Sequence, residues 1–241
     1  MPLELWRRFI VGQVFNQVYD AFMSQKPYIK YATSYLSVIG EREINSILEA
    51  GCGSGLFLQA MQKLGLNPVG MDIDNDILVL AAKRYPGTLV QGDICSYKSD
   101  IKWEVIYCPL DVLNYLSRKD LKKAMQNIAL LLKTGGLLIF DVHSKRRLKT
   151  MQGAFSQETS NEGSYFWSSR SRGRWLSYRI DCKYNNNYET YRLKERIHTI
   201  KEIKKAGREA KLKLQEISRA WDRQKVDRKT DRLLFVFTRE S

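Results

Sequence analysis

A glycine-rich turn between an apolar strand and a helix constrains the fold of this 241-residue chain more than any other feature. The segment 47–55 reads I-L-E-A-G-C-G-S-G, and a helical pattern starts directly after it at Leu56. Glycines in such a turn let backbone N–H groups approach a ligand at the N-terminus of the helix. The turn lacks both the G-x-G-x-x-G spacing of dinucleotide-binding enzymes and the G-K-[ST] ending of a phosphate-binding loop. Because acidic Glu49 precedes the glycines, the turn suits a ligand with a cationic amine and no phosphate.

The alternation of apolar strands and helices continues through the first 142 residues. Gly135 and Gly136 follow a helical pattern and are expected to cap that helix at its C-terminus. The next segment is almost wholly apolar, as in a central strand that is buried on both faces. Strands that alternate with helices predict a doubly wound, parallel sheet. The expected strands are 47–50, 68–74, 88–91, 103–108 and 137–142, and the expected helices between them are 56–61, 76–85 and 118–132.

The segments on either side of this core have different patterns. Aromatic residues at helical spacing in 5–39 predict two amphipathic helices separated near Pro27. Residues 144–164 are polar and rich in turn formers. Because hairpins do not occur within a parallel sheet, the strands that follow predict an inserted antiparallel cover. Those three strands are expected at 165–167, 175–184 and 188–198, and the core is expected to resume with a helix at 199–211 and strands at 212–221 and 232–238.

Composition argues against several classes of protein. No apolar run approaches the roughly 18 residues that a membrane span needs, and the N-terminus lacks the basic-then-apolar order of a signal peptide. The chain is therefore expected in the cytoplasm, away from membranes. The four cysteines show no close pairing, and the only histidines are His143 and His198. Free thiols and no structural metal are expected.

The net charge of +14 lies almost entirely in the C-terminal part of the chain. Residues 142–241 hold 25 Lys and Arg against 12 Asp and Glu, whereas residues 1–141 hold 15 against 14. Such asymmetry is typical of a surface that meets an anionic partner, and equally of a solvated basic face. In the predicted cover, cations are interleaved with Trp and Tyr. This pattern suits either a nucleic acid with stacked bases or a sheet whose aromatic face packs on the core.

Two further carboxylates are predicted at the same edge of the sheet as the glycine turn. Asp72 ends the second strand, 17 residues after Gly55, where a carboxylate can accept hydrogen bonds from ribose hydroxyls. Asp93 follows the third strand and can meet an exocyclic amine. Ligands of doubly wound sheets bind at the carboxyl ends of the strands. S-adenosylmethionine, with its sulfonium, its amino acid tail and no phosphate, matches this set of residues.

The chain resembles the class I, or seven-β-strand, S-adenosylmethionine-dependent methyltransferases in four motifs. These are the E-x-G-C-G-x-G turn, G-M-D-I at 70–73, G-D-I at 92–94 and L-K-T-G-G at 132–136, where Thr134 replaces the usual proline of the family. The resemblance covers about residues 17–143 and extends more weakly to the last strand. It implies a Rossmann-like α/β fold with a mostly parallel, seven-stranded sheet. The implied layout is a single domain with an N-terminal helical lid at 1–40, a cofactor-binding core at 41–143, the antiparallel cover at 144–198 and the last core elements at 199–241.

The resemblance also implies which residues bind S-adenosylmethionine. The glycines would line the methionine part, Asp72 would hold the ribose, and Asp93 would meet the adenine amino group. Tyr19 lies in a segment similar to the lid of small-molecule and uncharacterised bacterial members. The full set that the resemblance implies is Tyr19, Glu49, Gly51, Cys52, Gly53, Gly55, Asp72, Ile73, Asp93, Ile94 and Cys108.

Candidates for catalysis follow the fourth and fifth strands. The protein can accelerate methyl transfer mainly by aligning the acceptor and excluding water, but an amine acceptor must also lose a proton. Asp111, Tyr115 and His143 are the candidates for that role, although His143 can equally cap a strand end and Tyr115 can be a packing residue. The run C-P-L-D at 108–111 differs from the Asn/Asp-Pro-Pro-aromatic pattern of amino-directed nucleic-acid methylases.

A small molecule is therefore the expected methyl acceptor, and the sequence identifies neither the acceptor atom nor the oligomeric state. Two alternatives stay open. One is RNA methylation that uses the basic C-terminal part. The other is a non-catalytic role for a member of the fold that binds the cofactor.

Overall fold

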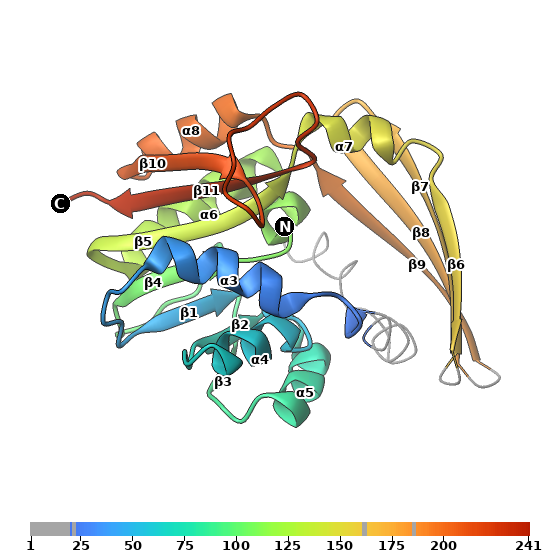
Figure 1. Ribbon diagram of the computed structural model, residues 1–241, viewed down its shortest axis with the longest axis horizontal. Helices are drawn as coiled ribbons and strands as arrows, with labels where there is room; N and C mark the ends of the chain where they lie inside the picture. The colour runs from blue at the N-terminus through green and yellow to red at the C-terminus, as the bar shows by residue number, and fades with distance from the viewer. Residues whose placement is uncertain (1–19, 21–22, 161–162, 185–186) are drawn as a thin grey trace. The chain divides into compact units, whose positions relative to one another are not determined.

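The computed structural model in Figure 1 describes residues 20, 23–160, 163–184 and 187–241. The helix expected before Pro27 and the predicted site residue Tyr19 lie outside these residues. The described part divides into two compact units. One unit comprises Pro27–Arg147 and Ile197–Ser241, and the other comprises Leu148–Arg196 with the described residues before Pro27. None of the helices described is long and apolar enough to cross a membrane.

The first unit contains a seven-stranded sheet in the order β10-β11-β5-β4-β1-β2-β3. The pairs among β1 to β5 are parallel, whereas β11 is antiparallel to both β5 and β10. This confirms the predicted mostly parallel, doubly wound sheet. The strands are β1 (Ile47–Ala50), β2 (Val69–Asp72), β3 (Leu89–Gln91), β4 (Trp103–Cys108), β5 (Leu132–His143), β10 (Leu212–Arg219) and β11 (Arg232–Arg239).

Capping side chains mark the start of some helices of this unit. Ser117 Oγ accepts a hydrogen bond from the Asp120 amide at the start of α6, and Thr199 forms a capping box with Glu202 at the start of α8. The helices are α3 (Tyr28–Ile39), α4 (Leu56–Lys63), α5 (Asn75–Arg84), η1 (Val112–Tyr115), α6 (Arg118–Leu131) and α8 (Ile200–Glu209), and α7 (Lys145–Thr150) follows β5.

The expected glycine cap of α6 was wrong. The helix ends at Leu131, and β5 begins at the next residue. Gly135, with φ +77°, lies within β5 where its register with β4 shifts. A Cβ on Gly136 would come within 2.8 Å of the Lys133 carbonyl oxygen. The two glycines therefore belong to an irregularity in β5. From their position in the sequence alone, such an irregularity cannot be distinguished from the cap of a helix.

The second unit contains a four-stranded antiparallel sheet, β6-β7-β8-β9. Three strands were predicted in this sheet, and the structure has a fourth, β6, in the segment that was expected to be rich in turns. This strand, F-S-Q-E-T-S, is polar and pairs with β7 through its backbone, so hydropathy gives no sign of it. The strands are β6 (Phe155–Ser160), β7 (Gly163–Arg172), β8 (Trp175–Tyr184) and β9 (Asn187–Arg196).

Stacked phenylalanines join two neighbouring strands of the core sheet, β5 and β11. Phe140 of β5 lies with its ring centroid 5.3 Å from Phe235 and 6.0 Å from Phe237 of β11, and the rings are nearly parallel. All three side chains are almost completely buried. This packing fixes β11 against β5 and therefore fixes the position of Arg232 at the start of β11.

Substitution Phe235→Ala is expected to destabilise the protein by about 3–5 kcal/mol, because it removes a buried ring and leaves a cavity. The matched control is Phe155→Ala, since Phe155 is 71% exposed and its loss should change stability by less than about 0.5 kcal/mol. Urea unfolding followed by circular dichroism measures both. Equal losses for the two variants would contradict the packing described.

Candidate active site

The carboxyl ends of the parallel strands bring the predicted site residues to one edge of the sheet. Because β1, β2, β4 and β5 run in the same direction, the segments that follow them meet there. The glycine turn follows β1, Asp72 ends β2, and Asp111 follows β4. His143 ends β5. These residues were predicted to share one edge of the sheet, and the topology of the strands agrees with that prediction.

The glycine turn has a backbone that side chains would disrupt. Gly51, Gly53 and Gly55 have φ values of +78°, +52° and +79°. A Cβ on Gly51 would lie 2.5 Å from a methyl group of Val112, whereas a Cβ on Gly53 would meet no atom within 4 Å. Gly51 therefore allows η1 to approach the turn. Gly53 leaves open space over the backbone at the N-terminus of α4.

Of the two carboxylates beside this turn, Glu49 is buried and Asp72 is half-buried. Glu49 is 0% exposed, and its Oε2 accepts a hydrogen bond of 2.6 Å from the Tyr107 hydroxyl. Its Oε1 has no hydrogen-bond partner among the described residues. Asp72 accepts hydrogen bonds from the amides of Gly53 (2.8 Å) and Asp74 (3.0 Å).

Burial raises the pKa of both Glu49 and Asp72 above the ordinary range, and the charge of Asp72 raises the pKa of Glu49 further. Among the described residues, no lysine or arginine forms an ion pair with either group. A buried carboxylate oxygen without a partner matches the cationic amine of S-adenosylmethionine. The residues present therefore fit that cofactor.

The other residues predicted to bind the cofactor lie near the same edge. Asp93 follows β3 and accepts a hydrogen bond of 2.8 Å from the Cys95 amide. Ile73 is partly exposed, whereas Cys52, Ile94 and Cys108 are buried. Their contacts with a cofactor stay predictions. All four cysteines of the chain are free.

A buried aspartate organises the other part of the edge. Asp141 of β5 is 0% exposed and accepts hydrogen bonds from the Tyr35 hydroxyl (2.5 Å) and from the backbone amides of Leu110 (2.7 Å) and Asp111 (3.1 Å). It also accepts one from Arg232. Leu110 and Asp111 have φ values of +57° and +60°, which non-glycine residues rarely adopt. The two hydrogen bonds from their amides stabilise this unusual turn.

The turn brings the Asp111 carboxylate close to an arginine and a histidine. Asp111 Oδ1 lies 2.6 Å from Arg232 Nη2 and 3.7 Å from His143 Nε2. Burial lowers the pKa of His143 well below its ordinary value, and the charges of Arg232 and Arg147 lower it further. His143 is therefore a neutral imidazole beside a carboxylate at neutral pH. The guanidinium of Arg232 also lies over the ring of Trp221, 5.5 Å from its centroid.

Of the three predicted catalytic candidates, the structure brings Asp111 and His143 together. Tyr115 ends η1, one residue after Asn114, whose side-chain oxygen accepts a hydrogen bond of 2.8 Å from the His143 amide. The sequence reasoning missed Arg232 as a member of this cluster. The available signal was a charged residue at the start of an apolar strand, since such a charge is rarely buried without a partner.

The stability of the protein is expected to depend on His143. Below pH 6.5 the unfolded chain protonates this histidine and the folded chain does not, so the free energy of unfolding falls with falling pH by up to about 1.4 kcal/mol per unit. Urea unfolding at pH 7.5 and 5.5 measures this slope. His143→Asn should reduce it, whereas His198→Asn leaves the His143 contribution in place. An unchanged slope in His143→Asn would contradict the depressed pKa.

Comparison with known proteins agrees with this geometry. Residues 47–136 match the family model described as a methyltransferase domain. A protein of Geobacillus sp. (strain WCH70), which carries a provisional methyltransferase name, is 28% identical over 160 residues, 62% of this chain and 65% of the relative. The dTDP-3-amino-3,4,6-trideoxy-alpha-D-glucopyranose N,N-dimethyltransferase of Streptomyces venezuelae is 28% identical over 130 residues, 52% of this chain and 55% of that enzyme. The chain thus aligns with less than two thirds of either relative.

Solved structures extend the likeness over nearly the whole fold. An S-adenosylmethionine-dependent methyltransferase from Clostridium acetobutylicum superimposes with a TM-score of 0.80 at 20% sequence identity, covering 95% of this chain and 97% of that structure. At this identity the likeness concerns the fold. Residues 47–136 thus match a methyltransferase domain, and the fold and sheet order of the chain are like those of a solved S-adenosylmethionine-dependent methyltransferase.

Proposed function

We propose that this chain transfers a methyl group from S-adenosylmethionine to an amine nitrogen of a small molecule, and that amino sugars are the first acceptors to test. The observation that carries the proposal is the pair formed by Asp111 and a neutral His143 at the carboxyl ends of β4 and β5. The Streptomyces venezuelae relative supports the acceptor class, since its name describes N,N-dimethylation of an amino sugar nucleotide.

The glycine turn and its carboxylates would hold the cofactor. Glu49 would pair with the cationic amine, and the open backbone at Gly53 would allow close approach of the methionine part. Asp72 would bind the ribose hydroxyls, and Asp93 the adenine amino group. The bound cofactor supplies an activated methyl group, so the protein needs only to align the acceptor and exclude water.

Asp111 and His143 would act on the acceptor. The Asp111 carboxylate is held by Arg232 and by the turn at Leu110, so it can orient an amine without moving itself. His143, neutral and 3.7 Å from Asp111, would accept the proton that the amine must lose. Arg232 would act through these two residues as a positioning residue.

Replacement Glu49→Gln is expected to weaken S-adenosylmethionine binding by about 10- to 100-fold, because a charge-assisted hydrogen bond to the amine is lost. Wild-type affinity should also fall as the pH drops through the raised pKa of Glu49, since the protonated carboxyl cannot pair with a cation. The variant should lose this pH dependence. Isothermal titration calorimetry between pH 5 and 8 measures both effects.

Glu43→Gln is the matched control for this substitution, because Glu43 is an exposed carboxylate outside the glycine turn. It should bind S-adenosylmethionine as the wild type does at every pH. Equal affinities for Glu49→Gln and Glu43→Gln would contradict the assignment of Glu49 to the amine.

The acceptor class is tested by transfer of a radiolabelled methyl group into small-molecule and RNA fractions of a lysate that lacks the protein, followed by a panel of amino sugars. Label is expected in the small-molecule fraction and on an amino sugar nitrogen. Asp111→Asn should lower this transfer by about 10²- to 10⁴-fold with unchanged S-adenosylmethionine affinity. Asp100→Asn, at an exposed aspartate, is the matched control and should retain full transfer.

Other outcomes of this experiment contradict the proposal. Label in RNA would support RNA methylation through the basic C-terminal part. Label on small molecules other than amines would overturn the acceptor class. Cofactor binding without label in any fraction would favour a non-catalytic member of the fold.

A further inference from the structure

A groove of about 730 Å³ lies between α8 and the strands β10 and β11. Apolar side chains contribute its lining, among them Ile200, Leu212 and Leu214. Leu212 pairs with Arg239, so the groove lies toward the end of β11 opposite Arg232. The groove is therefore separate from the Asp111–His143 pair, and nothing proposed above makes use of it.

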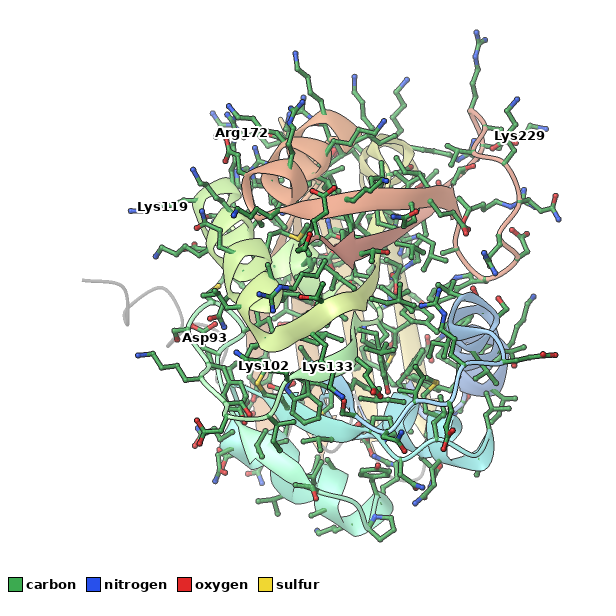
Figure 2. All side chains as sticks on the ribbon, turned by 90° about the vertical axis from the view of Figure 1, so that its left-hand side faces the viewer. Asp93, Lys102, Lys119, Lys133, Arg172 and Lys229 are labelled. Carbon is green, nitrogen blue, oxygen red and sulfur yellow. The ribbon has the colours of Figure 1, made fainter. Side chains whose placement is uncertain are left out.

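Four cations and one carboxylate, Glu240, surround the apolar lining. Lys201, Lys204 and Arg208 come from α8, and Lys213 comes from β10. Their side chains are exposed, and none of them forms an ion pair with a described residue. Figure 2 shows nitrogen-tipped side chains extending from α8 into the solvent. By contrast, Lys205 of the same helix lies 3.8 Å from Glu209. The four cations outnumber Glu240, the one carboxylate of the lining, and thus leave a net positive potential over the groove.

The strand beside the groove is an edge of the sheet. β10 is the last strand in the order of the seven, so one of its two edges pairs with no described strand. An open edge offers backbone N–H and C=O groups to an extended peptide, and neighbouring side chains then select its sequence. The groove therefore combines a row of backbone groups with apolar contacts and positive charge.

We propose that the edge of β10 and the adjoining groove bind an extended acidic segment of a partner protein in which apolar residues alternate with Asp or Glu. Apolar residues would contact Ile200 and Leu214, and carboxylates would pair with the unpaired cations. A second copy of this chain is a poor occupant, because two basic edges repel each other. RNA is also a poor occupant, because Phe237, the aromatic residue of the lining, is only 1% exposed and offers no stacking surface.

The test uses the full chain and a fluorescein-labelled ten-residue peptide that alternates Leu or Val with Glu, with fluorescence anisotropy as the readout. Binding is expected to weaken as salt is raised, and a peptide with Lys in place of Glu should not bind. Hydrogen exchange of residues 212–219 should slow on binding, which reports pairing of the peptide with β10. Single-stranded RNA of ten nucleotides is a parallel probe.

The variant Lys204→Glu/Arg208→Glu is expected to lower the affinity for the peptide at least about tenfold. The matched control is Lys119→Glu/Lys229→Glu, which changes the net charge equally at two lysines that Figure 2 shows elsewhere on the surface. The control should bind within about twofold of the wild type, and equal melting temperatures exclude misfolding.

Four results would overturn the proposal. Absence of peptide binding would mean that the lysines only protect the edge from pairing. Binding without slower hydrogen exchange in residues 212–219 would mean that the peptide does not pair with β10. Equal losses of affinity in the two charge variants would mean that binding depends on net charge alone. Tighter binding of RNA than of the peptide would assign the groove to nucleic acid.

Discussion

The arrangement of the site depends on one buried carboxylate, Asp141, in the middle of the sheet edge. It accepts hydrogen bonds from Tyr35 of α3, from the amides of Leu110 and Asp111 after β4, and from Arg232 of β11. Elements far apart in sequence are thereby tied to the end of β5. A buried carboxylate is costly unless such donors surround it, and removal of Arg232 would take away the opposite charge that compensates Asp141. The same contacts hold the unusual backbone at Leu110 and Asp111.

The two parts of the site differ in their charge balance, and this difference fits two kinds of ligand. Around the glycine turn, the buried Glu49 and the half-buried Asp72 have raised pKa values and no paired cation among the described residues. The part of the site around the glycine turn is therefore suited to a cationic group. At the ends of β4 and β5, Arg232 already pairs with Asp111 and Asp141, and His143 stays neutral beside them. In that part the charges are already paired, and the His143 imidazole is a titratable group left without a charge.

Much of the core could be predicted from the sequence because its patterns are local. The alternation of strands and helices predicted the parallel sheet, and the spacing of Gly51, Gly53 and Gly55 predicted a tight turn, in which all three glycines have positive φ values. The prediction failed where structure depends on pairing between distant segments. The polar strand β6 is held by its hydrogen bonds to β7, and Gly135 belongs to an irregularity of β5 against β4.

The sequence by itself determined the order of the core elements, the acidic glycine turn and the identity of the candidates Asp111 and His143. These depend on periodicity and on the conformations that individual residues permit, which are local properties of the chain. Only the tertiary structure decided that Asp141 and Arg232 join these candidates, and that cations of α8 and β10 surround one groove. The physical reason is that burial and electrostatic pairing depend on which strands become neighbours. Arg232 reaches Asp111 because β11 packs antiparallel against β5, across 121 residues of sequence.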